Sequence, residues 1–324
     1  MNTNKHYILI DCDPGGDDIF ALLRLLINHV FAHLPMEVIG ISTVWWNVSA
    51  NLTYLNVLRV CEFVWVNIPV AKDHRQLISQ DASAIHGEDG IGWFASMLPS
   101  PKLPEIELDS VDMIVQAIQT YGSDLTILAT GPLTNLALAE QRVSGILQQC
   151  KRIIMMGWAI AMHGNITPVA EFNIAYDPMS AKIVFDTTDN LVLAPLDLTT
   201  SMVFDNEDMM NCFREINHSD KQSFMFELTN FLIKTNMQFR ETWYEHGFYV
   251  HDAHTVWLLL YPHLYEGSFQ QVMVETQGEY TKGETIIDQR NIARVQTNTF
   301  VAMKFNKQLF LEAMIEDFRM FDFS

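Results

Sequence analysis

Four aspartates lie within eight residues near the start of the chain: Asp11, Asp13, Asp17 and Asp18. The segment reads Asp-Cys-Asp-Pro-Gly-Gly-Asp-Asp, and it stands between the apolar run 7–10 and the apolar stretch 19–23. Like charges this close repel one another, so a fold tolerates them when a cation or a polar ligand neutralises them. Because carboxylates offer only oxygen atoms, we expect a hard cation such as Ca²⁺ or Mg²⁺.

Ordinary turn and capping chemistry is the alternative interpretation of this segment. Asp-Pro-Gly is a common turn sequence, and an aspartate at the start of a helix commonly caps it. These roles account for two of the four acids. They do not account for two acids at the carboxyl end of a strand together with two more across a two-glycine turn. We therefore interpret the segment as a strand, an acidic turn and a helix that form part of a binding site.

The composition predicts one large globular domain. The chain has 324 residues, of which 49% are hydrophobic and 18% charged, and it contains no low-complexity tract, long Pro/Ser-rich linker or internal repeat. Folds of the α/β class often reach this length as one unit. We therefore expect a single domain over residues 1–324 with a sizeable hydrophobic core.

Charge and cysteine content restrict the partners and the compartment. The formal net charge is −19, which argues against nucleic acid or a membrane surface as a partner, because both attract basic patches. No apolar segment reaches membrane-spanning length, and the start has no signal-peptide hydrophobic region. The four scattered cysteines lack metal-ligand spacing and favour a reducing compartment. We expect a cytoplasmic protein that binds a neutral or cation-assisted small molecule.

Short runs rich in β-branched residues alternate with longer helical patterns, which is typical of βαβ units. The predicted strands are 7–10, 38–43, 68–71, 125–129, 152–156 and 191–196, and the predicted helices are 19–31, 51–64, 110–121, 133–139 and 178–185. We therefore predict an α/β fold with an open, mostly parallel (mixed), Rossmann-like sheet flanked by helices. An aromatic-rich segment around 224–250 is predicted to form a helical lid region, although aromatics at helical spacing more often belong to a core.

In open α/β sheets, ligands bind beyond the carboxyl ends of the strands. Several polar or unusual segments fall at these predicted ends: Asp11 with Asp13, Trp45-Trp46-Asn47, Thr130-Gly131, and Met156-Gly157-Trp158. They are therefore expected to converge on one active site.

These segments belong to a series that resembles the nucleoside hydrolases (inosine-uridine preferring nucleoside N-ribohydrolases). The N-terminal signature of that family is Asp-x-Asp-Pro-Gly-x-Asp-Asp, and residues 11–18 match it at every fixed position. Further matches follow in order along the chain at 40–47, 85–90, 129–135, 155–157, 165–173, 196–199 and 250–252. The resemblance implies an enzyme that hydrolyses the N-glycosidic bond of ribonucleosides to free base and ribose, with one bound Ca²⁺.

The resemblance also implies a metal site and a general base. The Ca²⁺ ligands would be the carboxylates of Asp13, Asp18 and Asp252 and the backbone carbonyl of Thr130, all of them oxygen ligands suited to this ion. Asp13 would accept the proton of the water that attacks C1′. Asp11 would support the metal ligands from behind.

Cleavage of a glycosidic bond builds positive charge on the sugar, so acceptors are expected around the ribose. By resemblance, the sugar-contacting positions are Asp17, Asn47, Asn165, Glu171 and Asn173. Of these, Asp17 and Asn173 are expected at the 2′ and 3′ hydroxyls, and Asn165 and Glu171 at the 5′ end.

Two histidines are candidates for the group that stabilises the leaving base. His251 stands where pyrimidine-cleaving and broad-specificity relatives carry a histidine with that role, and it directly precedes the expected ligand Asp252. His86, in the segment His-Gly-Glu-Asp-Gly, is the second candidate. A lone histidine is more often a structural residue, which is the alternative for both.

Departures from the family pattern concern specificity. Trp46 and Trp158 replace residues that are usually glycine, so that each either stacks on a purine or narrows the cleft. Phe239 replaces a frequent tyrosine on the lid side. Together with Met156, these residues are predicted to contact the substrate.

Two other classes of protein remain as alternatives. A catalytically weak homologue would bind a nucleoside or ribose without cleaving it. A haloacid-dehalogenase-type phosphohydrolase also has Asp-x-Asp after its first strand, but the following Pro-Gly-Gly-Asp-Asp does not fit that family. The family resemblance further implies a homodimer or homotetramer.

Overall fold

A central eight-stranded sheet organises the molecule in the computed structural model, which describes residues 5–31, 35–73, 75, 88–91, 94–102, 107–213, 226–230, 247–288 and 296–320. Its strands, in spatial order, are β3 (Val70–Ala71), β2 (Met36–Thr43), β1 (His6–Cys12), β4 (Leu125–Ala129), β5 (Arg152–Met156), β6 (Leu191–Ala194), β12 (Thr299–Phe305) and β9 (Tyr265–Gln270). All neighbours pair in parallel except β9, which runs antiparallel to β12 at one edge.

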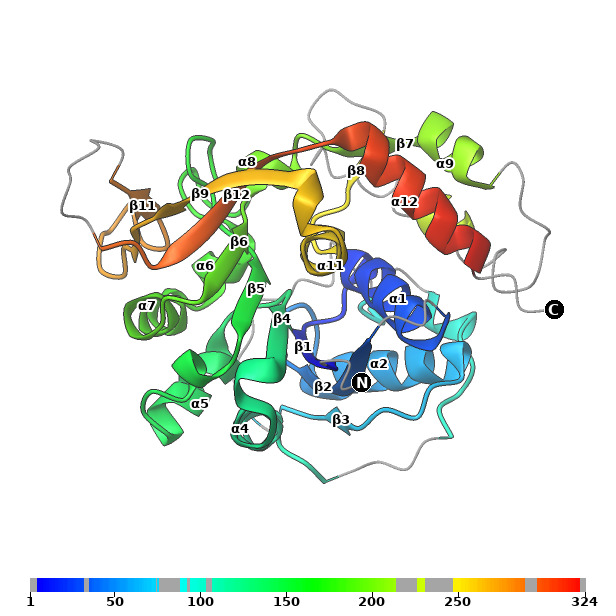
Figure 1. Ribbon diagram of the computed structural model, residues 1–324, viewed down its shortest axis with the longest axis horizontal. Coiled ribbons are helices and arrows are strands. Elements are labelled where there is room, and N and C mark those ends of the chain that lie inside the picture. The colour runs from blue at the N-terminus through cyan, green and yellow to red at the C-terminus, as the bar shows by residue number, and fades with distance from the viewer. Residues whose placement is uncertain are drawn as a thin grey trace.

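Helices cover both faces of this sheet (Figure 1). One layer consists of α1 (Gly16–Phe31), α2 (Ala50–Val64), α11 (Ala253–Leu260) and α12 (Lys307–Met320), and the other of α4 (Ser110–Tyr121), α5 (Thr134–Arg142) and α7 (Pro178–Thr187). Shorter elements include the helices α6 (Phe172–Tyr176), α8 (Leu196–Thr199) and α9 (Asn206–Phe213). Two small antiparallel pairs, β7 (Val203–Asp205) with β8 (Gly247–Tyr249) and β10 (Val272–Val274) with β11 (Thr285–Ile287), lie outside the central sheet.

Strand β1 illustrates why the sheet needs two helical layers. Successive side chains of a strand point to opposite faces, and here Ile8 and Ile10 pack with the α1 layer while Leu9 packs with the α4 layer. All three are fully buried. A strand that is apolar on both faces must be covered on both, as parallel sheets generally are.

The strand order places the functional segments side by side. The chain runs outward from β1 to β3 and then returns to β4 on the other side of β1, so the β1–β4 boundary is the point where the strand order reverses. Asp11 at the end of β1 pairs with Ala129 at the end of β4. Open α/β sheets bind ligands in the crevice at such a point.

The predicted α/β class and the mostly parallel sheet are confirmed. The strands predicted at 125–129 and 152–156 and the helix at 110–121 have the observed bounds, whereas the strand predicted at 191–196 ends at Ala194. Strands β9 and β12 were not predicted, and the exposed side chains of β9 explain why its pattern gave no signal.

The proposed lid lies largely outside the described residues, which cover only 226–230 and 247–250 of that segment. Both Phe239 and His86 also lie outside them. Within the part of the chain that the structure describes, no helix is long and apolar enough to cross a membrane.

Candidate active site

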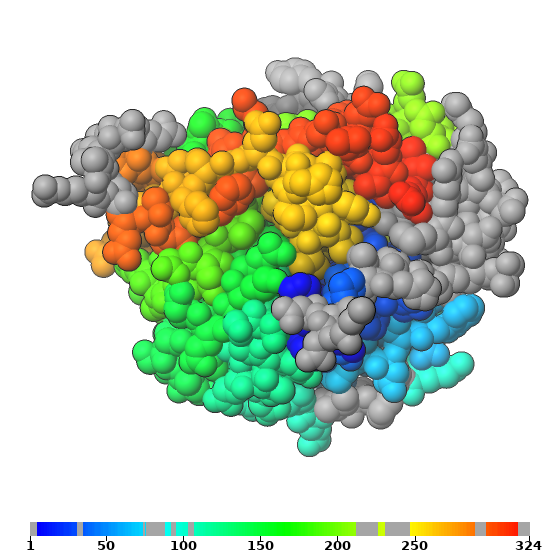
Figure 2. Space-filling model, in the orientation of Figure 1, coloured from blue at the N-terminus to red at the C-terminus, as the bar shows by residue number. Residues whose placement is uncertain are grey.

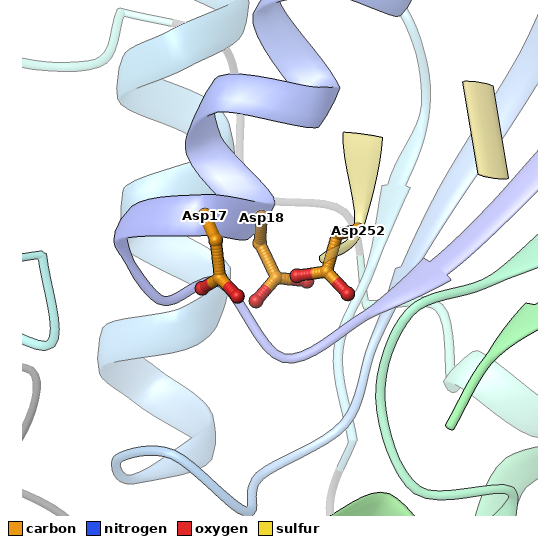
Figure 3. Close-up of side chains that lie close together, drawn as sticks. All are labelled: Asp17, Asp18 and Asp252. Atoms are coloured by element: carbon orange, nitrogen blue, oxygen red, sulfur yellow. The ribbon is translucent and has the colours of Figure 1, made fainter. Parts of the chain in front are cut away.

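Three carboxylates converge where α1 begins (Figure 3). Asp17 and Asp18 project from the first turn of α1, and Asp252 reaches the same space from the residue before α11. One oxygen of each lies within 4.8 Å of the others. Helices α1 and α11 pack against each other, and on the face shown in Figure 2 the segment containing α11 (yellow) lies directly beside the N-terminal elements (blue). The fold thus joins two halves of a site that are far apart in the sequence.

Asp18 is held by the ends of two strands. It is 2% exposed, and its Oδ2 accepts a hydrogen bond from the backbone N–H of Gly15 at 3.0 Å. Its Oδ1 accepts from the hydroxyl of Thr130 at 2.7 Å. Thr130 follows β4, so this bond connects the acidic turn after β1 to the neighbouring strand.

Asp13 lies beside this cluster, although it is not one of its three members. It is 2% exposed, and its Oδ2 has no hydrogen-bond partner among the described residues. The amide of Asn47 donates to its backbone carbonyl at 2.6 Å. Gly131 packs closely on its other side, since a Cβ there would lie 2.6 Å from Oδ1. Asp13 is therefore enclosed with one carboxylate oxygen left for a ligand.

Burial makes these acids unfavourable as anions when no cation is present. It raises the pKa of Asp18 to about 7, with the charge of Asp17 adding to the effect. Burial and neighbouring carboxylates raise the pKa values of Asp13 and Asp252 well above their usual range. A divalent cation would reverse this penalty, because it favours the charged form of every ligand. Buried oxygen donors, one of them unpartnered, fit a hard metal ion.

A chain of hydrogen bonds holds the carboxylate of Asp11 in place. Its Oδ1 accepts from Ser42 Oγ at 2.7 Å and from Asn135 Nδ2 at 2.8 Å. The guanidinium of Arg75 donates to the Oδ1 of Asn135, and it donates to Asp73 from Nε at 2.7 Å and from the terminal nitrogen at 2.5 Å. The backbone N–H of Arg75 also donates to Asp73, at 2.9 Å. This arrangement fixes the orientation of the Asn135 amide, so that its nitrogen faces Asp11.

Asn173 and Glu171 adjoin the acids through Thr130, whose hydroxyl contacts Asp18. The amide of Asn173 donates to the backbone carbonyl of Thr130 at 2.8 Å and to that of Met156 at 3.1 Å, which connects the ends of β4 and β5. Glu171 is 2% exposed and accepts from three backbone N–H groups, including those of Asn173 at 2.9 Å and Trp158 at 2.8 Å. Burial raises the pKa of Glu171 to about 7. Asn165 is exposed, and its Oδ1 accepts from the backbone N–H of Phe172 at 2.9 Å.

His251 is partly buried next to Asp252. Its Nδ1 lies 2.7 Å from the hydroxyl of Thr199, and its ring lies 5.3 Å from that of Tyr249. Burial lowers the pKa of His251 to about 4, while the charge of Asp17 opposes the change. The imidazole is therefore neutral near pH 7.

The two tryptophans at family glycine positions differ in their surroundings. Trp46 is partly buried, stacks on Trp45 with ring centroids 4.3 Å apart, and donates from Nε1 to Thr134 at 3.2 Å. Tyr176 meets Trp46 edge-on, with ring centroids 5.2 Å apart. Burial raises the pKa of Tyr176, and the charge of Asp13 adds to this effect, which places this aromatic group near the acids.

The side chain of Trp158, in contrast, faces the core. It is fully buried, and its ring meets that of Phe185 edge-on, with centroids 6.1 Å apart. Its φ of 92° belongs to the left-handed region where glycine is the usual residue. The prediction that the Trp158 ring stacks on or obstructs the base does not agree with this packing, because the ring has no exposed surface. Only its backbone, through the bond to Glu171, reaches the site.

Three residues that contact predicted site residues were not identified from the sequence. They are Ser42 and Asn135, which contact Asp11, and Thr199, which contacts His251. Each lies inside a segment that matches the family, at 40–47, 129–135 and 196–199. The matches therefore contained a signal for them, but a single serine, asparagine or threonine has no distinctive spacing. Their partners come from the fold.

Fold and site together define an α/β enzyme with a buried acidic cluster, able to hold a metal ion, at the carboxyl edge of its sheet. Residues 8–312 match the family described as inosine-uridine preferring nucleoside hydrolase. The pyrimidine-specific ribonucleoside hydrolase RihA of Enterobacter is 33% identical over 313 residues, which cover 95% of this chain and 96% of that protein.

Solved structures give the same assignment. A plant nucleoside hydrolase superposes with a TM-score of 0.85 at 26% identity, covering 97% of this chain and 99% of that one. A purine-preferring ribonucleoside hydrolase from Gardnerella vaginalis also has a TM-score of 0.85 at 26% identity, covering 97% and 98%. The chain belongs to the nucleoside hydrolase family, and it is an N-ribohydrolase that acts on ribonucleosides.

Proposed function

We propose that this enzyme hydrolyses the N-glycosidic bond of ribonucleosides with one Ca²⁺ held by Asp13, Asp18, Asp252 and the carbonyl of Thr130. The observation that carries the proposal is the convergence of buried carboxylates from both halves of the chain near the boundary between β1 and β4. When bound, the cation would neutralise these acids and lower the pKa of the attacking water. Its ordinary coordination number of 6–8 leaves positions for ribose hydroxyls and water.

Asp13 is the proposed general base. Its buried, unpartnered Oδ2 supports this role, because an oxygen with no protein donor is free to accept a proton. As the water oxygen bonds to C1′, its proton passes to Asp13, and the C1′–N bond breaks with its electron pair moving to the base. His251 donates a hydrogen bond to the departing base, which shares that new negative charge.

The ribose is proposed to lie between the acidic cluster and Asn173. Asp17 and Asn173 would bind the 2′ and 3′ hydroxyls, and Asn47 offers a buried Oδ1 without a partner among the described residues. Glu171 already caps α6 with its carboxylate, so we assign it mainly to fixing Asn173. Asn165 would reach the 5′ end from its exposed position.

Pyrimidine ribonucleosides are proposed to be among the substrates. Relatives named for pyrimidine specificity match 95% of the chain at 33% identity, and the neutral His251 suits a base that leaves with excess charge. Trp46 and Met156 would contact the sugar or the base. His86 and Phe239 remain predicted contacts. The homodimer or homotetramer also remains a prediction, which light scattering after gel filtration tests.

The decisive experiment tests release of reducing sugar from uridine, cytidine, inosine and adenosine by chelator-treated protein, with Ca²⁺ or Mg²⁺ restored. We expect hydrolysis that depends on Ca²⁺. Asp13→Asn should lower kcat at least about a thousandfold, because an amide cannot accept the water's proton. Asp112→Asn, which changes an exposed carboxylate on α4, is the matched control. Substantial activity in Asp13→Asn would refute the assignment of the base, and no release from any nucleoside by calcium-loaded protein would refute the function.

A further inference from the structure

A buried hydroxyl contacts His251, the histidine proposed to stabilise the leaving base. The Oγ1 atom of Thr199 lies 2.7 Å from Nδ1 of His251, and Thr199 is fully buried at the end of α8. The carbonyl of Pro195 accepts two backbone N–H groups, those of Leu198 at 2.9 Å and of Thr199 at 3.0 Å, and His251 is the hydroxyl's only hydrogen-bond partner among the described residues. The pair thus forms an isolated hydrogen bond between α8 and the segment before α11.

Short helix α8 is itself held firmly. Both carboxylate oxygens of Asp197 accept backbone N–H groups, from Ile160 and from Ala161, each at 2.8 Å. The backbone N–H of Leu196 donates to the carbonyl of Trp158 at 2.7 Å. The hydroxyl of Thr199 therefore has a fixed place from which to orient the imidazole.

Hydrogen-bond accounting determines which partner donates. A threonine hydroxyl has one hydrogen, and a neutral imidazole has one N–H and one acceptor nitrogen. If Nδ1 donated, the buried hydroxyl hydrogen would have no acceptor among the described residues, which is unfavourable. If the hydroxyl donates, Nδ1 accepts and the ring hydrogen must lie on Nε2. That nitrogen has no partner among the described residues, so it is the one available to a substrate.

We propose that Thr199 is a positioning residue that holds His251 in the Nε2–H tautomer, so that the ring donates a hydrogen bond to the leaving base. The proposal rests on the proposed function for the role of His251, and it adds the residue that sets the direction of the donated bond. No proton or electron is exchanged between Thr199 and His251. A ring with its hydrogen on Nδ1 would offer the base an acceptor instead.

Two substitutions at Thr199 separate the effect of its hydroxyl group from the effect of its side-chain volume. Thr199→Val keeps the volume and removes the donor, and Thr199→Ser restores the donor. Thr199→Val should lower kcat for uridine roughly 10- to 100-fold with little change in KM, as loss of an orienting partner commonly does. It should have a much smaller effect on p-nitrophenyl riboside, whose phenolate leaves without a donor. Thr199→Ser should recover most of the lost rate.

Thr53→Val is the matched control, because it removes another buried hydroxyl, which bonds the carbonyl of Ala50 at 3.1 Å in α2. It should leave the ratio of the two substrates unchanged. Equal losses on uridine and the aryl riboside in Thr199→Val, or no recovery in Thr199→Ser, would show a structural role and overturn the proposal.

The ¹⁵N chemical shifts of His251 give a readout that does not depend on activity, with His251→Gln used to assign the signals. We expect a protonated Nε2 and an unprotonated Nδ1 in the wild type near neutral pH, and a mixture of tautomers in Thr199→Val. A wild-type ring protonated on Nδ1 would overturn the proposal even in a fully active enzyme. If the shifts agree but no nucleoside is hydrolysed, the proposed function fails and the positioning contact stands.

Discussion

The acidic cluster should make the metal-free protein less stable as the pH rises. Burial and neighbouring acids raise the pKa of Asp18 from 3.8 to about 7, and they raise the pKa values of Asp13 and Asp252 well above 3.8. An acid with a higher pKa in the folded than in the unfolded protein binds more protons when folded. For Asp18, this contribution to the free energy of unfolding is complete below about pH 4, near the pKa of the unfolded state. It is lost as the pH rises to about 7, the pKa of the folded state.

The pKa shift of Asp18 alone gives the order of magnitude of this loss of stability. The change from 3.8 to about 7 is about three pKa units, and at about 1.4 kcal/mol per unit it corresponds to about 4 kcal/mol. This is a large part of the roughly 5–15 kcal/mol by which native proteins are stable. Ca²⁺ at about 100 times its Kd would restore about 2.7 kcal/mol, because it binds the folded protein.

Urea unfolding of chelator-treated protein at about pH 5 and about pH 8, with and without Ca²⁺, measures these differences. Asp252→Asn removes one charge from the cluster. The metal-free variant should be more stable than the wild type at the higher pH, and Ca²⁺ should stabilise it far less. Asp112→Asn changes a carboxylate that is 49% exposed and should behave like the wild type in both respects.

Metal-free wild-type protein whose stability relative to Asp252→Asn does not fall between about pH 5 and about pH 8 would refute the reasoning; the comparison with the variant removes the opposite contribution of His251, whose pKa burial lowers to about 4. So would an Asp252→Asn variant with the same dependence on pH and on Ca²⁺ as the wild type. Either result would mean that these carboxylates do not share a desolvated space.

Two further substitutions test the packing around the acids. Gly131→Ala should weaken Ca²⁺ binding at least about tenfold in calorimetric titrations, since the new methyl would lie 2.6 Å from Oδ1 of Asp13 and displace it; wild-type affinity would contradict that close approach. Arg75→Met should lower the free energy of unfolding by about 2 kcal/mol, because it leaves the buried carboxylate of Asp73 without its cationic partner and with only the backbone N–H of residue 75. Adding Asp73→Asn should recover part of this loss, whereas strictly additive losses would show that the two side chains do not interact.

Much of the local structure could be predicted from the sequence. The apolar run 7–10, the acidic turn and the apolar stretch 19–23 predicted a strand, a turn and a helix, and β1 and α1 occupy these positions. Local patterns suffice here because strand and helix periodicities of two and 3.6 residues are properties of short segments. Strand β9 was not predicted, because an edge strand with four consecutive exposed residues lacks the alternation of apolar and polar residues that marks a half-buried strand.

The membership of the site depended on the tertiary structure. The family resemblance implies that Asp17 contacts the sugar and that Asp13 is a metal ligand, and these roles stay predictions. In the structure the compact trio consists of Asp17, Asp18 and Asp252, and Asp13 lies close enough to feel the charges of Asp17 and Asp18. Helix α1 turns both of its first two acids toward the residue before α11, and no local pattern encodes that contact. Likewise, the direction of the Trp158 ring follows from a positive φ and from the space beside Phe185.

The sequence by itself determined the α/β class, the acidic turn at the end of the first strand and the family to which its ordered segments point. These depend on periodicity, charge and residue type within short stretches of chain. Only the tertiary structure decided that Thr130 contacts Asp18, that Thr199 contacts His251 and that Asn135 joins Arg75 to Asp11. Such pairs are separated by 52 to 124 residues, and they form because the strand order and the helical layers bring distant segments together.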